Sequence, residues 1–405
     1  MFDVVVVGAG PAGLGAALAV ARQGASVCVV DRAQQVGGLC VTRETRGDRY
    51  DIGGHILFVR SSERERWLKG LLGEDLLWVD RAVARVQDGQ IVGGRYLDDA
   101  AGDGGPPARP DQGGADYLDA TVGPGSSAAR RYLEKIDGMA LEDIPATRVE
   151  RLLIGQAAPN GFYYPRKGIG QLMNAAAGAI RARGGTTILG RLVGAIDVAG
   201  SRTRGIVLGG SSGEEALSTR RVIVAVPTGH ATRLAVPRAP TSATPTLRMR
   251  AVAIVYLAAQ VDRLTEEPWI QIDDPDVPFA RLFEPANWSP ALSQSGRTVI
   301  GCECYCQEGA QDPIWRHTDD SLGRWCAEAL TEVLGLIEGP NDVELVEVVR
   351  LPRAYPVVPV SEVVSAGAPS RWLSNVAGLE IAQGGAVIEA IEAGEAAAGR
   401  ALADL

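Results

Sequence analysis

The chain is poor in positive charge, and above all in lysine. Its 405 residues carry 40 lysines and arginines against 49 aspartates and glutamates, which gives a net charge of −9. Only Lys69, Lys135 and Lys167 are lysines. This deficit argues against nucleic acid or an anionic membrane as the main partner. The length favours a two-domain enzyme.

The sequence also lacks an uninterrupted apolar run. The stretch Val4–Ala21 has no charged residue and is long enough to resemble a membrane-spanning helix, but Pro11 and four glycines interrupt it. It has neither the basic start nor the cleavage site of a signal peptide. We therefore expect no integral membrane segment and a cytoplasmic location.

Cysteine is sparse, with six residues, as is usual in a reducing compartment. Cys302, Cys304 and Cys306 alternate along one predicted strand, so their thiols would point to one face. A metal or redox site is one interpretation, although zinc sites more often use a C-x-x-C spacing. We favour a buried strand with small side chains and expect no metal.

Glycine, by contrast, is abundant, and three glycines near the start predict a ligand site. A valine-rich strand beginning at Asp3 ends at Gly8, which with Gly10 and Gly13 has the spacing G-x-G-x-x-G. An alanine-rich helix and a second strand ending on Asp31 follow. Such glycines allow a tight turn, the approach of a pyrophosphate to a helix N-terminus, and close helix packing. The unit predicts dinucleotide binding, the alternative being a glycine-rich turn without a ligand.

Further glycine pairs favour FAD over a nicotinamide cofactor. Gly37-Gly38 follows Asp31 closely, and Gly53-Gly54 comes soon after. Nicotinamide-dependent Rossmann enzymes usually run straight into the next element here, so two pairs indicate a longer cofactor. A third pair, Gly384-Gly385, precedes a C-terminal helix whose N–H groups can hold an anion or the polar edge of a ring.

The order of segments predicts an α/β fold: a Rossmann-type FAD-binding domain with a parallel sheet, interrupted by a mixed α+β substrate domain. Residues 1–60, 159–236 and 365–405 are assigned to the FAD-binding domain. A helical and loop part, 61–158, and a sheet part, 237–364, are assigned to the substrate domain.

Local patterns predict individual elements. Residues 61–72 are expected to form a helix with a serine N-cap, and the Gly/Pro/Asp-rich stretch 100–115 a loop. Residues 204–208 and 216–217 would form a small antiparallel meander. The apolar run 220–229 predicts a separate, central parallel strand that stops at Pro227.

Taken together, these motifs resemble the FAD-dependent amine oxidase superfamily. The resemblance rests on the glycine fingerprint, Asp31-Arg32, the D-x-G-G-H segment at 51–55, Y-P-x-x-G-I-G-x-L at 164–172, and the C-terminal glycine pair. It covers nearly the whole chain. The nearest branch looks like the protoporphyrinogen-oxidase-like and phytoene-desaturase-like flavoproteins, with UDP-galactopyranose mutase as a relative of similar fold.

The resemblance implies which residues hold the flavin. The fingerprint would bind the pyrophosphate, Asp31 the adenosine ribose, and the backbone of Val193 the adenine, while the C-terminal pair would place a helix N-terminus at the flavin ring. The implied cofactor-binding residues are Gly8, Gly10, Pro11, Ala12, Gly13, Asp31, Arg32, Gly37, Gly38, Leu39, Gly53, Gly54, His55, Val193, Gly384, Gly385, Ala386 and Val387.

Departures from the family pattern matter as well. Many amine oxidases of this superfamily hold a lysine near flavin N5, contributed by the second half of the chain, but here no lysine follows Lys167. Relatives with a covalently linked flavin use a cysteine near the C-terminus, and the last cysteine here is Cys326. We therefore expect noncovalent FAD, and the missing lysine weakens the interpretation as a simple amine oxidase.

In this scaffold the flavin performs the difficult step, and the protein orients the substrate. His55 is the best candidate for a catalytic or flavin-tuning polar group, the alternative being a histidine satisfied by the backbone. Candidate substrate contacts lie at the junction of the two domains and on strands of the substrate domain: Tyr163, Tyr164, Arg166, Arg281, Glu303 and Tyr355.

The expected function is an FAD-dependent oxidase or desaturase that removes two hydrogens from a C–N or C–C bond of a small molecule. Electrons would pass to molecular oxygen or another acceptor. A redox-neutral flavoenzyme such as a nucleotide-sugar mutase is the alternative, and a non-enzymatic flavin-binding protein is a third. Substrate identity stays open, as does a homodimer.

Overall fold

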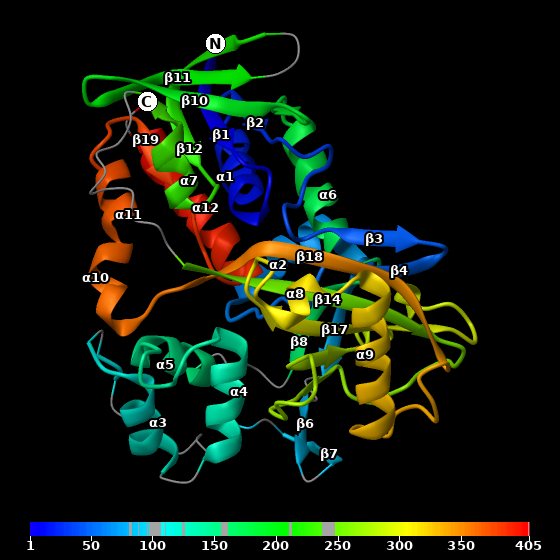
Figure 1. Ribbon diagram of the computed structural model, residues 1–405. Helices are drawn as coiled ribbons and strands as arrows, with labels where there is room; N and C mark the ends of the chain where they lie inside the picture. Colours follow the sequence, from blue (N-terminus) through cyan, green and yellow to red (C-terminus); the bar gives the residue numbers. More distant parts are fainter. Residues whose placement is uncertain are drawn as a thin grey trace.

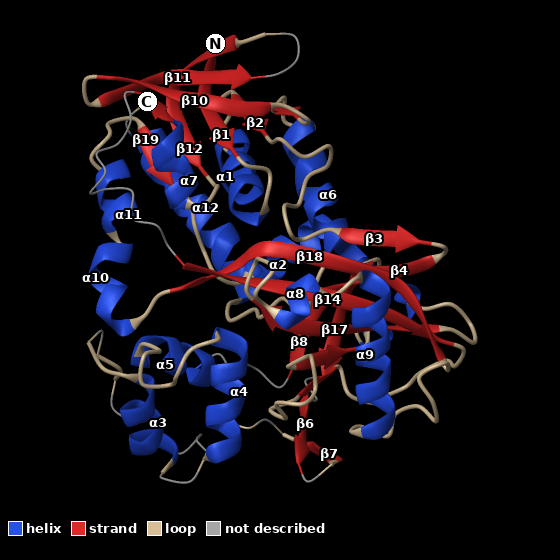
Figure 2. Ribbon diagram, viewed as in Figure 1, coloured by secondary structure: helices blue, strands red, loops and turns tan. Residues whose placement is uncertain are grey.

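The computed structural model describes residues 1–80, 83–87, 89–94, 96, 107–109, 111–123, 126–154, 161–209, 213–236, 248–403 and 405. Half of the loop predicted over 100–115, residues 100–106 and 110, lies outside these residues. Figure 1 shows one sheet at the top of the molecule, a second below it, and a group of helices beside the second. Figure 2 shows helices on the lower side of the upper sheet.

The upper sheet has the strand order β13-β10-β11-β12-β1-β2-β9, with β19 also paired to β12. Its strands are β1 (Phe2–Val7), β2 (Val27–Val30), β9 (Thr186–Ile188), β10 (Leu192–Ala199), β11 (Arg202–Gly209), β12 (Glu215–Val224), β13 (Ala235–Val236) and β19 (Leu379–Ile381). Strands β19, β12, β1, β2 and β9 run parallel, so their carboxyl ends share one edge. Ligands of open parallel sheets bind at that edge.

Three helices cover this sheet from below: α1 (Pro11–Arg22), α6 (Ile169–Arg181) and α12 (Val387–Ala403). Two glycines let α1 and α12 approach closely. A Cβ on Gly15 would lie 2.7 Å from the Ile391 carbonyl oxygen, and one on Gly394 would lie 2.0 Å from that of Ala12. The C-terminal helix is therefore fastened to the helix that follows the glycine fingerprint.

Strand β12 differs from its prediction. The sequence predicted separate strands at 216–217 and 220–229, but one strand spans Glu215–Val224 and helix α7 (Thr228–Leu234) follows. Its first half pairs antiparallel with β11 and is largely exposed, and its second half pairs parallel with β1 and is buried. Because the residues change from polar to apolar along the strand, the sequence pattern indicated two strands where there is one.

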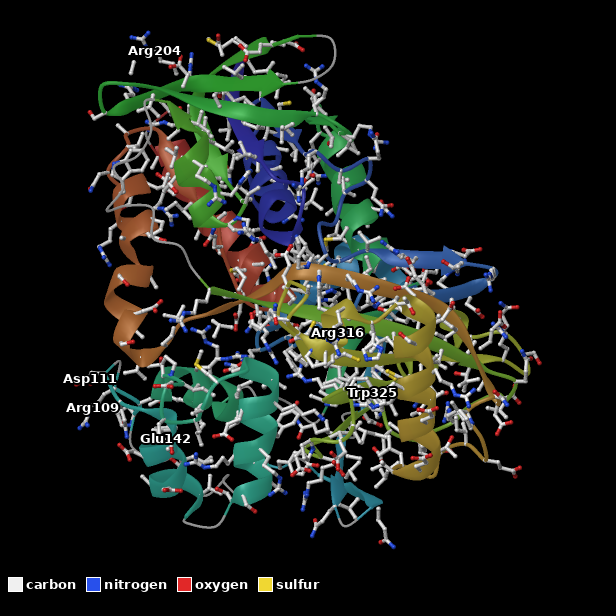
Figure 3. All side chains as sticks on the ribbon, in the orientation of Figure 1. Arg109, Asp111, Glu142, Arg204, Arg316 and Trp325 are labelled. Carbon is white, nitrogen blue, oxygen red and sulfur yellow. The ribbon has the colours of Figure 1, made fainter. Side chains whose placement is uncertain are left out.

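The lower sheet has the order β18-β14-β17-β16-β15-β6-β7. Its strands are β6 (Val83–Gln87), β7 (Gln90–Gly93), β14 (Arg248–Ala259), β15 (Trp269–Gln271), β16 (Arg281–Phe283), β17 (Thr298–Cys306) and β18 (Val343–Val357). Along β14, alternate residues belong to different cores: Ala253 and Val255 pack with helix α9 (Asp319–Glu332), whereas Ile254 and Tyr256 pack on the opposite face. Trp325 of α9, labelled in Figure 3, packs against the core that contains Ala253 and Val255.

The other face of the lower sheet meets a helical group, α3 (Gly114–Val122), α4 (Ser127–Asp137) and α5 (Ala146–Ile154). The β-hairpin of β3 (Thr42–Thr45) and β4 (Asp48–Asp51) lies between the two halves of the molecule, as does the antiparallel pair of β5 (Leu76–Asp80) with the distant β8 (Gly161–Pro165). The remaining helices are α2 (Ser62–Leu72), α8 (Pro313–Arg316), α10 (Val363–Ala366) and α11 (Ala368–Leu373). Helix α2 follows the N-cap Ser61, whose side chain accepts a hydrogen bond from Arg64 N–H; a serine N-cap was predicted here.

Candidate functional site

The glycine fingerprint, Asp31 and Gly37 form one hydrogen-bonded unit at the carboxyl edge of the upper sheet. Ala9 N–H donates to Asp31 Oδ2 (2.7 Å), and Ala33 N–H donates to Oδ1 (2.8 Å). Gly37 N–H donates to the Ala9 carbonyl (2.8 Å). The carboxylate that was expected to meet a ribose thus also ties the second strand to the glycine turn.

Two fingerprint glycines have different reasons to be glycine. A Cβ on Gly13 would lie 1.8 Å from the Gly8 carbonyl oxygen, so helix packing alone requires glycine there. Gly10 has an ordinary extended backbone, φ −77°, and a Cβ would meet nothing closer than the Gly37 carbonyl oxygen at 4.0 Å. Neither its conformation nor the protein's own packing explains Gly10, which leaves room for a bound group.

The start of α1 fits an anion in that room. Gly10 is the N-cap, Pro11 occupies the first turn, and no side chain caps the helix or places an acid in its first turn. Unpaired N–H groups at a helix start attract a phosphate. The residues present therefore fit the pyrophosphate of a dinucleotide.

The neighbouring segments implied for adenine and for the flavin ring reach the same edge. Arg191 N–H donates to the Asp31 carbonyl (3.1 Å), so β10, which contains the buried Val193, starts beside Asp31, while Arg32 is exposed. Gln383 Nε2 donates to the Val226 carbonyl (2.8 Å) beyond the end of β12. Gly384, Gly385 and Ala386 follow, exposed, and α12 begins at Val387.

The segment with the second glycine pair is held by the lower sheet. Gly53 N–H donates to the Tyr256 hydroxyl (3.0 Å), which itself donates to the Asp51 carbonyl (2.5 Å). Gly54 N–H donates to Glu303 Oε1 (3.4 Å). Tyr256 was not predicted as a site residue, and it sits on a strand more than two hundred residues away in the sequence.

His55 joins the two glycine pairs. Its Nε2 lies 3.1 Å from the carbonyl oxygen of Leu39, next to Gly38. A carbonyl only accepts, so this bond assigns the proton to Nε2 and leaves Nδ1 of the neutral ring as an acceptor. In its neutral form the half-buried imidazole therefore presents Nδ1 as the accepting nitrogen.

Three predicted substrate residues come together on the lower sheet, and two unpredicted tyrosines join them. Arg281 pairs across the strands with Glu303, 3.7 Å between Nη1 and Oε2, and donates from Nε to the Tyr132 hydroxyl (2.8 Å). The Tyr305 hydroxyl donates to Glu303 Oε2 (3.0 Å), and its ring stacks on Tyr355 at 6.0 Å. Tyr305 lies two residues after Glu303 on one strand, a spacing that places both on the same face.

The other three predicted substrate residues lie elsewhere, at the junction around β5 and β8. Tyr164 is fully buried and its hydroxyl donates to the carboxylate of Asp51. Arg166 pairs with Asp75 (3.1 Å), and Tyr163 meets the edge of Trp78 at 5.0 Å. Burial and a hydrogen bond to Glu65 raise the pKa of Tyr163 to about 12.

Asp51, which opens the D-x-G-G-H segment, is a buried carboxyl that fastens this junction. Burial raises its pKa, against hydrogen bonds from Thr42 and Tyr164 that lower it. The Ile169 N–H at the start of α6 also donates to it. Asp51 therefore ties α6 and β8 to the segment that carries Gly53 and His55.

The alternating cysteines belong to the opposite face of β17, in the core shared with α9. Cys304 Sγ lies 3.8 Å from Cys326 Sγ, and both residues are buried. In the described part of the chain no group of three or more His, Cys, Asp or Glu side chains could hold a metal ion. Nor do the described helices include one long and apolar enough to cross a membrane.

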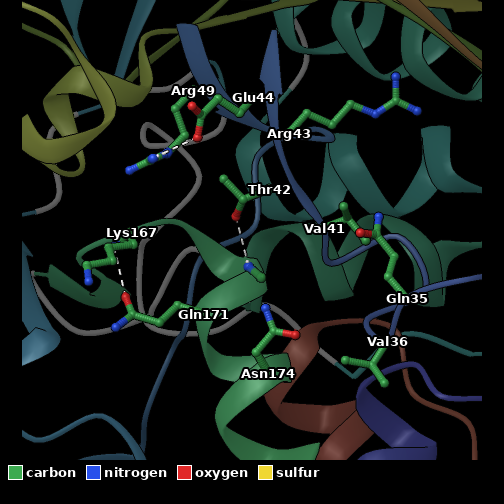
Figure 4. A pocket seen from close by; sticks show the side chains of 11 residues that line it. Gln35, Val36, Val41, Thr42, Arg43, Glu44, Arg49, Lys167, Gln171 and Asn174 are labelled. Carbon is green, nitrogen blue, oxygen red and sulfur yellow. Dashed lines mark hydrogen bonds and ion pairs between the residues drawn. The ribbon is translucent and has the colours of Figure 1, made fainter. Parts of the chain in front are cut away.

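A polar cleft of about 300 Å³ lies beside the Gly37–Cys40 turn, between α6 and the β3–β4 hairpin (Figure 4). Val36 and Val41 flank the turn, and Arg43, Lys167 and Asn174 contribute polar groups. None of the residues implied for flavin or substrate lines this cleft. It is therefore separate from the site built above.

Comparisons with known proteins bear on the family and on the fold. The NAD(P)-binding Rossmann-like domain model matches residues 6–72, and the flavin containing amine oxidoreductase model matches residues 139–345. A reduced UDP-galactopyranose mutase has a TM-score of 0.79 at 16% identity, covering 100% of this chain and 96% of that one. A putative protoporphyrinogen oxidase from Exiguobacterium sp. 255-15 has 0.73 at 15% identity, covering 99% of both.

At these identities the structural likeness shows the fold alone. A soluble pyridine nucleotide transhydrogenase from Yersinia pestis (strain Pestoides F) is 34% identical over 88 residues. That match covers 20% of this chain and 19% of the transhydrogenase, so it spans about a fifth of the relative's length.

Proposed function

The chain belongs to the flavin containing amine oxidoreductase family and is a flavin-dependent oxidoreductase, and from this premise we propose that its flavin is noncovalent FAD. Gly8, Gly10 and Gly13 would hold the pyrophosphate and Asp31 the adenosine ribose. The ring would lie between the His55 segment and the start of α12. The unexplained glycine at position 10, above an uncapped helix start, is the observation that carries this proposal.

The chain's own residues would place the substrate and manage its proton. FAD, when bound, supplies a hydride acceptor at its ring. At the start of α12 Glu389 Oε2 already accepts from Ala386 N–H (3.2 Å), and the remaining N–H groups there would stabilise negative charge nearby. Nδ1 of His55 would accept a proton from the substrate. Tyr305 and Tyr355 would pack against the substrate and exclude water.

We propose net oxidation of a C–N or C–C bond in a small molecule, with oxygen or another acceptor taking the electrons. A redox-neutral rearrangement of a nucleotide sugar would need arginines that clamp a diphosphate. Among the described residues, Arg281 lies beside Tyr132 and Tyr305. The nearby Arg250 is buried, and its guanidinium donates to backbone carbonyls. This favours the oxidation.

The test is the absorption spectrum of the purified protein and of two glycine variants. Wild type should show oxidised-flavin bands at about 370 and 450 nm, and acid precipitation should release the flavin. Gly10→Ala should fold normally but bind FAD at least about tenfold more weakly, because its Cβ enters the pyrophosphate space. Gly178→Ala on α6, where a Cβ meets nothing within 4 Å, is the control and should bind FAD normally. A colourless wild-type protein that FAD cannot reconstitute would refute the proposal.

A further inference from the structure

We propose that Arg281 sets the charge of the substrate, so that this site binds a molecule carrying an oxyanion, a carboxylate or a phosphate, and rejects a cationic amine. The inference rests on the proposed function, because it concerns the substrate side of the same site. It departs from the amine substrate that the family's name suggests.

Arg281 occupies the place that an ammonium group would need. Its guanidinium lies 5.7 Å from the centroid of the Tyr305 ring, a cation–π arrangement, and its Nε donates to the Tyr132 hydroxyl. Aromatic rings attract a substrate cation only where that position is free. A cationic substrate would therefore meet a fixed positive charge beside the aromatic wall.

Glu303 does not offer a counter-charge to an amine. Its side chain is 7% exposed, and its oxygens are engaged by Tyr305, by Gly54 N–H and, at 3.7 Å, by Arg281. Arg250 donates to three backbone carbonyls, one of them that of Tyr305, and has no carboxylate partner among its hydrogen bonds. The carboxylates of Asp137 and Asp312 favour the charged form of Arg250, so the positive charge that a ligand would meet is that of Arg281.

Arg281 also retains free donors. Its side chain is 31% exposed, Nη1 lies 3.7 Å from Glu303 Oε2, beyond hydrogen-bond distance, and within the described residues Nη2 makes no hydrogen bond. A carboxylate or a phosphate accepts two parallel bonds from such an edge. Tyr355, 42% exposed and stacked on Tyr305, offers a flat apolar surface for the organic part of the same ligand.

The contact between Glu303 and Gly54 connects this cluster to the flavin segment. Because Gly54 and His55 are adjacent, a ligand held by Arg281 would lie near the imidazole and the ring that it accompanies. Arg281 is thus a specificity-determining residue for the proposed oxidation.

The test uses four probes with one common ring: benzoate, phenyl phosphate, benzylamine and benzyl alcohol. Each is titrated into the purified flavoprotein, with binding followed by the flavin difference spectrum and by calorimetry. We expect benzoate or phenyl phosphate to bind at least about tenfold more tightly than benzylamine. Which of the two binds more tightly distinguishes a carboxylate from a phosphate substrate.

Variants assign the effect to one side chain. Arg281→Met should weaken oxyanion binding at least about tenfold, while Arg281→Lys should keep part of the preference, because the charge remains and the forked geometry is lost. Arg324→Met, an exposed arginine on α9, is the matched control and should change nothing. Equal or tighter binding of benzylamine by wild type, or unchanged oxyanion binding in Arg281→Met, would overturn the inference.

Failure of the proposed function would look different. A protein that binds no FAD would lack the flavin bands, yet calorimetry with the same probes would still report whether Arg281 selects an oxyanion. Normal flavin bands with no oxyanion preference would refute the charge selection alone.

Discussion

At the scale of single residues, the imidazole of His55 is the candidate group whose orientation the structure defines most closely. The Leu39 carbonyl holds Nε2 as the donor, and the segment that carries His55 is fixed by Tyr256 and Glu303. A base must be oriented as well as unprotonated, and here the backbone supplies the orientation. Nδ1 is therefore the nitrogen available to a substrate.

His55→Gln tests this assignment. The glutamine amide can still donate to the Leu39 carbonyl, but it has no basic nitrogen. We expect FAD to bind as in wild type, while anaerobic bleaching of the flavin by an active substrate slows by about 100-fold, since general bases contribute about 10²–10⁴. Stopped-flow absorbance measures the rate. A rate within threefold of wild type would leave His55 a structural role only.

At the scale of elements, Arg250 couples helix α4 to strand β17. It is 8% exposed, and its guanidinium donates to the carbonyls of Lys135 and Ile136 in the last turn of α4 and to that of Tyr305. Gly138, the left-handed C-cap of α4 with φ +68°, lies so close that a Cβ would be 2.6 Å from this guanidinium. The helix that supplies Tyr132 to the site is thus positioned by a residue on the sheet.

Arg250→Met should leave these carbonyls unsatisfied. We expect a loss of about 2–4 kcal/mol in the free energy of unfolding, because buried acceptors that lose a charged donor cost about 1–3 kcal/mol each and not all stay buried. Denaturant unfolding measures the loss. Arg324→Met, on the exposed face of α9, should shift the free energy by less than about 0.5 kcal/mol. An equal effect of both variants would contradict the coupling.

At the scale of the whole molecule, many phenols and thiols are buried, and burial raises their pKa values. The pKa values of Tyr164, Tyr256 and Tyr305 lie well above 10, and that of Cys28 is raised to about 11. Burial lowers the pKa of Lys135 to about 8. This one group has the opposite effect on the pH dependence of stability. The folded protein therefore keeps protons that the unfolded chain releases near pH 9–10.

Stability should consequently fall on the alkaline side. Raised pKa values contribute stability that is complete below the unfolded pKa and is lost as the pH rises through the folded value, at about 1.4 kcal/mol per pH unit for each group. Denaturant unfolding between pH 7.5 and about 10.5, with tyrosinate absorbance as a second probe, measures this slope. Cys28→Ala should reduce the slope by up to the contribution of one group, about 1.4 kcal/mol per pH unit. A stability that is level or rising over this range would contradict the prediction.

Much of the cofactor side was accessible from sequence, because its signals are local. The strand, turn and helix from β1 to α1 are specified by valines, glycines and a proline within twenty residues, and α2 by its serine cap. The domain boundaries and the roles of the site residues stay predictions. Strand β12 was divided wrongly because its two halves face different environments.

The sequence by itself determined the glycine fingerprint, the acid that follows it and hence the flavin-binding class, since turns and helix starts depend on neighbouring residues. Only the tertiary structure decided which glycine is explained by packing and which is not, which nitrogen of His55 faces the Leu39 carbonyl, and that Arg281, Glu303 and Tyr355 meet Tyr132 and Tyr305. These contacts depend on strand register and on elements far apart in the chain. No local pattern specifies such register, so the chemistry of the substrate side emerges only when the sheets are assembled.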